Sequence, residues 1–178
     1  MDYLRLVNHH WLNISKKNIN NFEPVAVGKN GIRKRSEVFS RELSNDYTKN
    51  KVIELDTLII GMGTKQIDIA ILHDDVKYCV SPAYSTFHVH DIDSYYFENL
   101  LKSINYLLSL RYMISGARQG KSVNKKELLL HKIFVHSKQE QLNISNLLNL
   151  LENKIKIETK ILNNYTLQKQ YLLKNLFI

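Results

Sequence analysis

The sequence predicts an α+β chain in which a mixed α/β domain is followed by a long C-terminal helix that forms a coiled coil. Three observations predict this: short β-branched and aromatic runs in mid-chain, a helical apolar period after them, and a C-terminal stretch without Gly or Pro. The 178 residues, 44% hydrophobic and 24% charged, can bury one core and carry one appendage. This excludes intrinsic disorder and leaves little room for two full domains. We expect the domain over residues 1–137 and the helix over residues 138–178.

The middle of the chain contains four runs typical of short strands, because they are rich in β-branched and aromatic residues. Turn-forming residues follow the first three runs. The segment from Gly28 to Arg35 is rich in Gly and basic residues and poor in apolar ones, which predicts an exposed loop. The four runs are Leu55–Ile60, Ile67–Leu72, Val76–Val80 and Tyr84–Val89.

After these runs the apolar period becomes helical. From Tyr96 to Met113 the apolar residues fall on one side of a helix, and Gly116 ends it. Asn124 followed by Glu127 resembles a helix start, so a short helical turn and one more strand are expected up to Val135.

The C-terminal helix begins at a capping box, Ser137-Lys138-Gln139-Glu140, and no Gly or Pro interrupts it afterwards. Alternate spacings of four and three define a coiled-coil seam of about five heptads, roughly 50 to 55 Å long. A compact domain of this size is about 30 to 35 Å across, so we favour a partner helix over packing on the chain's own domain. The predicted interface residues are Ile144, Leu148, Leu151, Ile155, Leu162, Tyr165, Leu172 and Leu176, with Glu158 and Lys169 as register-setting charges on the same seam.

The charge pattern predicts a polyanionic partner. The formal net charge is +8, and the basic residues are concentrated in two blocks. Residues 16–51 carry nine basic and four acidic residues, and residues 111–126 carry five basic and none acidic. Between them, residues 54–98 are acidic, with a net charge of −6. We predict DNA contacts from the basic residues Lys29, Arg33, Lys34, Arg35, Lys65, Arg118, Lys121 and Lys125.

Several features constrain where the chain works. Its single cysteine, Cys79, cannot form an internal disulfide. The first residues are too polar for a signal peptide, and no apolar run approaches the roughly 18 residues of a membrane span. A soluble, cytoplasmic protein without membrane contact is therefore expected.

Three near-matches to catalytic motifs each lack a physical requirement. The run from Gly116 to Ser122 has three residues between its glycines where a phosphate-binding P-loop needs four, although a basic turn there can still bind a phosphodiester. Gly61-Met62-Gly63 and Ser81-Pro82-Ala83-Tyr84 are similar to methyltransferase motifs, but too little αβ alternation surrounds them. The seven histidines form no spaced ligand set with Cys79. We therefore predict no catalytic residue, no metal site and no cofactor of its own.

A set of motifs along the chain resembles the DNA specificity subunit of type I restriction-modification enzymes. The set comprises Val80-Ser81-Pro82-Ala83-Tyr84-Ser85-Thr86-Phe87, a helix ending at Gly116 and Gly120, the strand Lys132-Ile133-Phe134-Val135, and Glu140-Gln141 opening a long helix that closes on Leu172 to Phe177. The likeness covers the chain from about Trp11 to the C-terminus. It departs from the family in one place, because the usual proline before Glu-Gln is replaced by His136-Ser137-Lys138-Gln139.

This resemblance implies a target recognition domain followed by a spacer helix, and it implies a half-subunit, since the family commonly carries two of each. Two such domains on antiparallel spacers would bind a split target in double-stranded DNA. Type I methyltransferase subunits, which bind S-adenosylmethionine, and a restriction and motor subunit would complete the assembly. The second spacer would come from another copy of this chain or from a different half-subunit.

Two other classes of function stay open at this point. One is a small S-adenosylmethionine-dependent DNA adenine methyltransferase built on the two motifs named above. The other is a coiled-coil adaptor without a DNA role.

Overall fold

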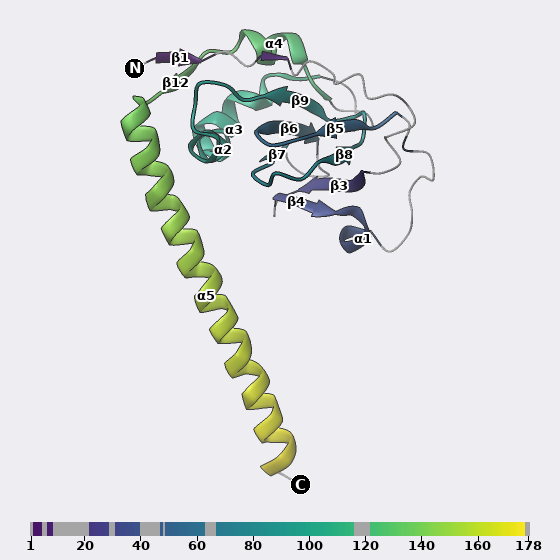
Figure 1. Ribbon diagram of the computed structural model, residues 1–178, viewed down its shortest axis with the longest axis vertical. Coiled ribbons are helices and arrows are strands. Elements are labelled where there is room, and N and C mark those ends of the chain that lie inside the picture. Colours follow the sequence, from purple (N-terminus) through teal and green to yellow (C-terminus); the bar gives the residue numbers. More distant parts are fainter. Residues whose placement is uncertain are drawn as a thin grey trace. The chain divides into compact units, whose positions relative to one another are not determined.

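The computed structural model describes residues 2–4, 7–8, 22–28, 31–39, 47, 49–62, 67–115 and 122–176 (Figure 1). The chain divides into two compact units, Met1–Lys138 and Gln139–Ile178. The first unit holds two four-stranded sheets with short helices, and the second is a single long helix. The predicted α+β class with a long C-terminal helix is therefore confirmed.

The first sheet has the strand order β2-β9-β6-β7, and all its described pairings are antiparallel. Its central strand β6 (Thr57–Met62) lies between β9 (Ser85–His88) and β7 (Ile67–Ile71), with β2 (Val7–Asn8) at the edge. Thr57 to Gly61 are all buried, which explains why the sequence shows a continuous apolar run there. The turn-forming residues that follow the first predicted run are Gly61-Met62-Gly63, and the turn prediction is wrong for Gly61 and Met62, because β6 continues through Met62, which pairs with Ile67; Gly63 lies outside the described residues.

The second sheet has the order β4-β3-β8-β5, and it corrects one prediction. Its strands are β3 (Glu23–Gly28), β4 (Gly31–Lys34), β5 (Lys51–Ile53) and β8 (Tyr78–Val80). The segment from Gly28 to Arg35, predicted as an exposed loop, instead contains a β-hairpin in which Gly31 adopts φ +80°. Tertiary contacts explain why this segment forms a hairpin and not a loop. Val25 and Val27 are buried in the core, and β3 pairs in parallel with β8.

The two sheets share one apolar core, since the core residues come from strands of both. Val25, Val27, Ile53 and Val80 come from the second sheet, and Ile59, Ala70 and Leu72 come from the β6–β7 part of the first. The other face of the first sheet is covered by α2 (Ser94–Lys102), which packs on β7 and buries Phe97 and Leu101.

The helix predicted from Tyr96 to Met113 is in fact two helices, α2 and α3 (Ile104–Arg111). The break lies at Ser103, whose backbone is extended and whose side chain accepts a hydrogen bond from the Tyr106 amide. Asp93 caps α2 in the same way, through the Tyr96 amide. A local N-cap therefore overrides an apolar period that continues across it.

Short elements complete the first unit: α1 (Arg35–Val38) follows β4, β10 (Ile114–Ser115) pairs with β11 (Ser122–Val123), and α4 (Lys125–Leu130) follows. Strand β12 (Ile133–Val135) pairs with β1 (Asp2–Leu4), as Leu4 opposite Ile133 shows. The second unit is formed by α5 (Lys138–Leu176), 39 residues long, which begins directly after Ser137 as the capping box predicts.

Candidate functional site

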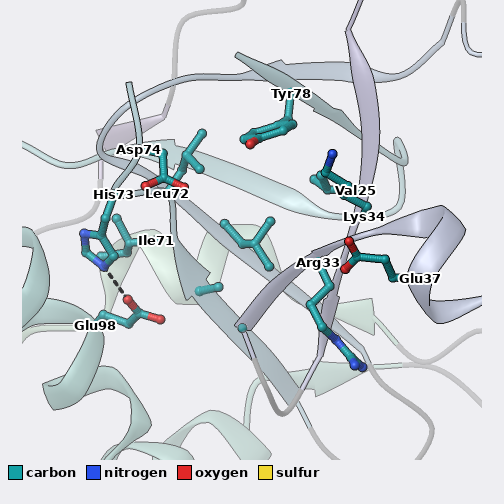
Figure 2. A pocket seen from close by; sticks show the side chains of 13 residues that line it. Val25, Arg33, Lys34, Glu37, Ile71, Leu72, His73, Asp74, Tyr78 and Glu98 are labelled. Carbon is teal, nitrogen blue, oxygen red and sulfur yellow. Dashed lines mark hydrogen bonds and ion pairs between the residues drawn. The ribbon is translucent and has the colours of Figure 1, made fainter. Parts of the chain in front are cut away.

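The β3–β4 hairpin presents the predicted DNA contacts that the structure describes with their side chains. Arg33 and Lys34 are exposed at the end of β4, and Arg35 opens α1. Adjacent residues of a strand point to opposite faces, and Figure 2 shows Arg33 and Lys34 directed apart. Arg33 and Lys34 therefore do not share one face of the strand.

Each of these cations has different surroundings. Lys34 Nζ lies 3.0 Å from Glu23 Oε2, and this hydrogen bond and ion pair raise the pKa of Lys34 above its usual 10.5. The Arg35 guanidinium lies 5.8 Å from the centroid of the Phe39 ring, a cation–π contact. Arg33 forms no ion pair with any residue in the described part of the chain. Its full charge is therefore open to a phosphate.

A surface cavity of about 450 Å³ lies beside the hairpin (Figure 2). Its polar lining is mixed: the basic residues Arg33, Lys34 and His73 line it together with the acidic residues Glu37, Asp74 and Glu98. A pocket that selects a phosphate concentrates positive charge, whereas these carboxylates would repel it. The cavity therefore does not have the charge of a phosphate-binding pocket.

At one side of this cavity Glu98 joins α2 to the end of β7. Its Oε2 lies 2.5 Å from His73 Nε2, and its Oε1 lies 2.5 Å from Lys102 Nζ. Burial raises the pKa of Glu98, but the hydrogen bonds from His73 and Lys102 outweigh it and leave the pKa below its usual 4.5. Glu98 is thus a charged, paired carboxylate that ties the helix to the sheet.

Ser94 extends this cluster into a Ser-His-Glu series, which invites comparison with a hydrolase triad. However, Ser94 Oγ lies 3.5 Å from His73 Nδ1, longer than the about 2.6–3.2 Å of a nucleophile–base pair. The nearby amides of Tyr96 and Phe97 donate to Asp93, so they are not available to stabilise an oxyanion. The series therefore offers no complete acyl-transfer site.

Five other predicted DNA contacts have no described side chain. Lys29, Lys65, Arg118 and Lys121 lie outside the described residues, and Lys125 lies in α4 with only its backbone described. One cation of the basic block, Lys51, is buried and donates to the backbone carbonyl of Tyr84. Lys51 therefore belongs to the core and cannot contact DNA.

The two methyltransferase-like motifs meet in the fold for a packing reason. Gly61 lies in β6, where an added Cβ would fall 2.3 Å from the Tyr84 ring, so Tyr84 occupies the space that a side chain would need. The Tyr84 hydroxyl in turn donates to the Val27 carbonyl at 3.3 Å. This pair joins the two sheets, which favours a structural role for both motifs.

Cys79 is buried, and burial raises the pKa of its thiol above the usual 9.0. A protonated, enclosed thiol is a poor nucleophile and a poor metal ligand. In the part of the chain that the structure describes, no group of three or more His, Cys, Asp or Glu side chains is placed to hold a metal ion. Likewise, no described helix is long and apolar enough to cross a membrane.

Helix α5 carries the predicted pairing residues. Ile144 and Leu148 are half-buried, whereas the residues from Leu151 to Leu176 on the seam are 44–69% exposed. The exposed seam residues are Leu151, Ile155, Leu162, Tyr165, Leu172 and Leu176. These large apolar side chains at regular spacing form an apolar face that α5 leaves in water.

The heptad analysis missed a second row of apolar residues beside the seam. Four of these residues are also exposed, and they follow one another along one flank of the helix at intervals of one or two turns: Leu147, Leu150, Ile157 and Ile161. The signal was present in the sequence, as an apolar residue one position before several seam positions. It widens the apolar face of α5 beyond the two positions per heptad of a minimal coiled coil.

Comparison with known proteins adds no further assignment: no protein-family model matches the chain, and no curated protein matches it either.

Proposed function

We propose that this chain is a DNA-specificity half-subunit of a type I restriction-modification complex, with one target recognition domain and one spacer helix. The observation that carries the proposal is α5, which leaves its apolar seam exposed from Leu151 to Leu176 while the first unit keeps its own core. A recognition domain that has its own core does not need the long helix in order to fold. The helix is then free to serve as a scaffold. This division of work suits a subunit that binds DNA and also holds other subunits.

The electrostatics support the DNA-binding part of the proposal. The chain carries a net charge of +8, and phosphate contacts by Lys and Arg release counterions and supply affinity. Within the described residues, Arg33 is the exposed hairpin cation without an ion pair, so we expect it to contact phosphate. Lys34 is held by Glu23 and contributes less.

The proposed complex supplies the chemistry that this chain lacks. Methyltransferase subunits binding S-adenosylmethionine would pack beside the spacer, and a restriction and motor subunit would join them. The specificity half-subunit would locate the target, and the reaction would take place on the partners. A half-subunit that pairs with its own copy requires an interrupted palindrome as target, whereas pairing with a different half-subunit requires an asymmetric split sequence.

Selection of bound duplexes from a randomised DNA pool tests the proposal directly. The full chain, alone and with a type I methyltransferase subunit, should enrich one short motif, repeated with a gap. Binding should weaken as salt rises, and Arg33→Ala should lower the slope of log affinity against log salt by about one.

Lys160→Ala is the matched control, because it removes the same charge from an exposed position on α5. It should leave the motif and the salt slope unchanged. A pool that shows no enriched motif contradicts the proposed function. An Arg33→Ala salt slope equal to that of Lys160→Ala contradicts the proposed phosphate contact of the hairpin.

A coiled-coil adaptor without a DNA role is the second candidate, and one observation favours it. Two cations of the basic block are already engaged, Lys34 by Glu23 and Lys51 by the Tyr84 carbonyl. If the full chain binds no duplex at low salt yet associates through α5, the adaptor replaces the specificity subunit as the better proposal.

A further inference from the structure

The cavity beside the β3–β4 hairpin has an apolar floor and a polar rim (Figure 2). The floor is formed by four buried or half-buried apolar residues, Val25, Ile32, Ala70 and Leu72, whereas most of the charged lining residues are exposed. The volume of about 450 Å³ lies within the range of small-molecule sites, about 300–1,000 Å³. The cavity therefore has the size and the floor for a small organic molecule.

The two hairpin cations do not make the interior of the cavity positive. Lys34 Nζ lies 3.0 Å from Glu23 Oε2, and the hydrogen bond and charge of Glu23, together with the charge of Glu37, raise the pKa of Lys34. Arg33 is directed away from Lys34, to the other face of β4 (Figure 2). Lys34 is therefore compensated within the fold, and Arg33 serves the opposite face of the hairpin.

On the other side of the cavity, two basic groups share one carboxylate. Glu98 Oε2 lies 2.5 Å from His73 Nε2, and Glu98 Oε1 lies 2.5 Å from Lys102 Nζ. Two lining carboxylates, Asp74 and Glu37, form no ion pair with any described residue. The charge that stays uncompensated at the rim of the cavity is therefore negative.

These two carboxylates lie on opposite sides of the cavity, and an aromatic ring lies between them in the view of Figure 2. Asp74 follows β7, Glu37 belongs to α1, and the half-buried ring is that of Tyr78 in β8. A carboxylate accepts hydrogen bonds from an ammonium group, and the face of an aromatic ring attracts a cation. Methylene groups between two such cations would cover the apolar floor.

We propose that this cavity binds a small organic dication, a linear diamine, with one ammonium group at Asp74 and the other at Glu37. The methylene chain of the diamine lies on the floor, beside the ring of Tyr78. This inference goes beyond the proposed function, because it requires neither DNA nor a partner subunit.

Other classes of ligand fit the cavity less well. A phosphate or carboxylate ligand would meet Asp74 and Glu37 as like charges. A metal ion needs several ligands at one point, and the described residues contain no group of three or more His, Cys, Asp or Glu side chains placed to hold one. The net charge of +8 repels cations at long range, so binding of a dication would report a local site.

NMR titration of the isotope-labelled full chain with diaminobutane, at constant ionic strength, tests the site. The amide signals of Glu37, Asp74 and Tyr78 should shift together and saturate with one dissociation constant. Butylamine, which has the same chain and one ammonium group, should bind about fivefold more weakly, because one ion pair at an exposed carboxylate is lost. Succinate, which has charges of the opposite sign, should not shift these signals.

Substitution of each carboxylate locates the two ammonium groups. Asp74→Asn and Glu37→Gln should each weaken diaminobutane binding about fivefold and abolish the preference for diaminobutane over butylamine. Asp75→Asn is the matched control, because it removes the same charge from the next residue, which is exposed and does not line the cavity. Asp75→Asn should leave both the affinity and the preference unchanged.

A conservative pair at Tyr78 tests the contribution of the ring. Tyr78→Leu keeps an apolar side chain but removes the aromatic face, so it should weaken diaminobutane binding about threefold. Tyr78→Phe keeps the ring and should bind as the wild type does. The amide spectrum of each variant shows whether its first unit is folded.

The outcomes separate this inference from the proposed function. The diamine site is overturned if diaminobutane causes no shift at about 20 mM, or if butylamine binds the wild type as tightly. It is also overturned if Asp75→Asn acts as strongly as Asp74→Asn, or if Mg²⁺ at equal concentration displaces the diamine. None of these readouts involves DNA, so failure of the duplex selection would overturn the DNA role and leave the diamine site standing.

Discussion

The two units of this protein place their apolar side chains in opposite surroundings. The Met1–Lys138 unit buries side chains such as Leu58, Phe87 and Phe97 completely, between sheets and under α2. Helix α5 supplies fourteen of the twenty-two large apolar side chains that are exposed among the described residues. The first unit therefore buries its apolar side chains within the chain, whereas α5 leaves most of its described apolar side chains in water.

Because of this difference, we expect similar substitutions to have different consequences in the two units. A buried side chain of the first unit should contribute to the free energy of unfolding, whereas an exposed seam residue of α5 should not. Paired substitutions, one in each unit, test this expectation.

Removal of a large apolar side chain should give the largest contrast. Phe97→Ala empties a fully buried site under α2 and should cost about 3–5 kcal/mol of unfolding free energy. Leu162→Ala, which truncates an exposed seam residue, should leave the unfolding of the first unit unchanged and weaken association. Urea denaturation, read from near-ultraviolet circular dichroism, measures the first effect, and sedimentation measures the second. Equal losses of unfolding free energy in both variants would break the comparison.

Adding one methyl group at Gly61 should give the next largest effect. The Cβ of Gly61→Ala would meet the Tyr84 ring at 2.3 Å, so the variant should lose about 1–3 kcal/mol of unfolding free energy. The cost should shrink when Tyr84→Ala is combined with it, because the space is then vacant. Asn163→Ala in α5 is the counterpart, and it should leave the denaturation midpoint of the first unit in place.

Neutralising Glu98 should give a loss of similar size that depends on pH. Because the pKa of Glu98 is lowered in the folded chain, its stabilisation is present above its usual pKa of 4.5 and is lost as pH falls through the folded value. Glu98→Gln should therefore cost about 1–3 kcal/mol at pH 7. The difference from the wild type should vanish at lower pH, as thermal unfolding across a pH series would show. On α5, Glu152→Gln should change the same curve little, since Glu152 is exposed.

Removing the Tyr106 hydroxyl should give the smallest effect. This group is buried and has no hydrogen-bond partner among the described residues, and burial raises the pKa of Tyr106 above its usual 10.0. Tyr106→Phe should therefore leave the unfolding free energy within about 0.5 kcal/mol of the wild type or increase it. A loss of more than about 1 kcal/mol would reveal a polar partner for the hydroxyl.

The elements that could be predicted from the sequence are those that depend on local or periodic signals. The start of α5 follows from the Ser137 capping box, and its length follows from the absence of Gly and Pro. Strands β6 and β7 can be recognised in the sequence as apolar runs, because both are buried at nearly every position. In each case the neighbours along the chain carry the information.

The elements that escaped prediction depend on partners far along the chain. The β3–β4 hairpin is stabilised by β8, so its basic, apolar-poor sequence resembles a loop when taken alone. Lys51 looks like a surface cation until Tyr84 is seen to accept its hydrogen bond. The break at Ser103 was detectable in principle, since a serine beside an apolar stretch is a frequent N-cap.

The candidate site divides in the same way. The predicted seam rests on its spacing alone, and its pairing stays a prediction, whereas the availability of each basic side chain depends on its folded neighbours. Glu23 engages Lys34 and the Phe39 ring lies near Arg35, whereas neither Arg33 nor Arg35 forms an ion pair with a described residue. Charge counting predicted a basic region but could not rank its members, and the DNA contact itself stays a prediction.

The ladder between β1 and β12 has a consequence for how the protein is made. Asp2 pairs with Val135 and Leu4 with Ile133, so the first unit lacks its last ladder until residue 135 has left the ribosome. α5 begins three residues later, at Lys138. The apolar seam of α5 is therefore synthesised only after all the described strands of the first unit have been synthesised. If α5 pairs with another helix as proposed, this order of synthesis delays that pairing until the strands of the first unit have been made.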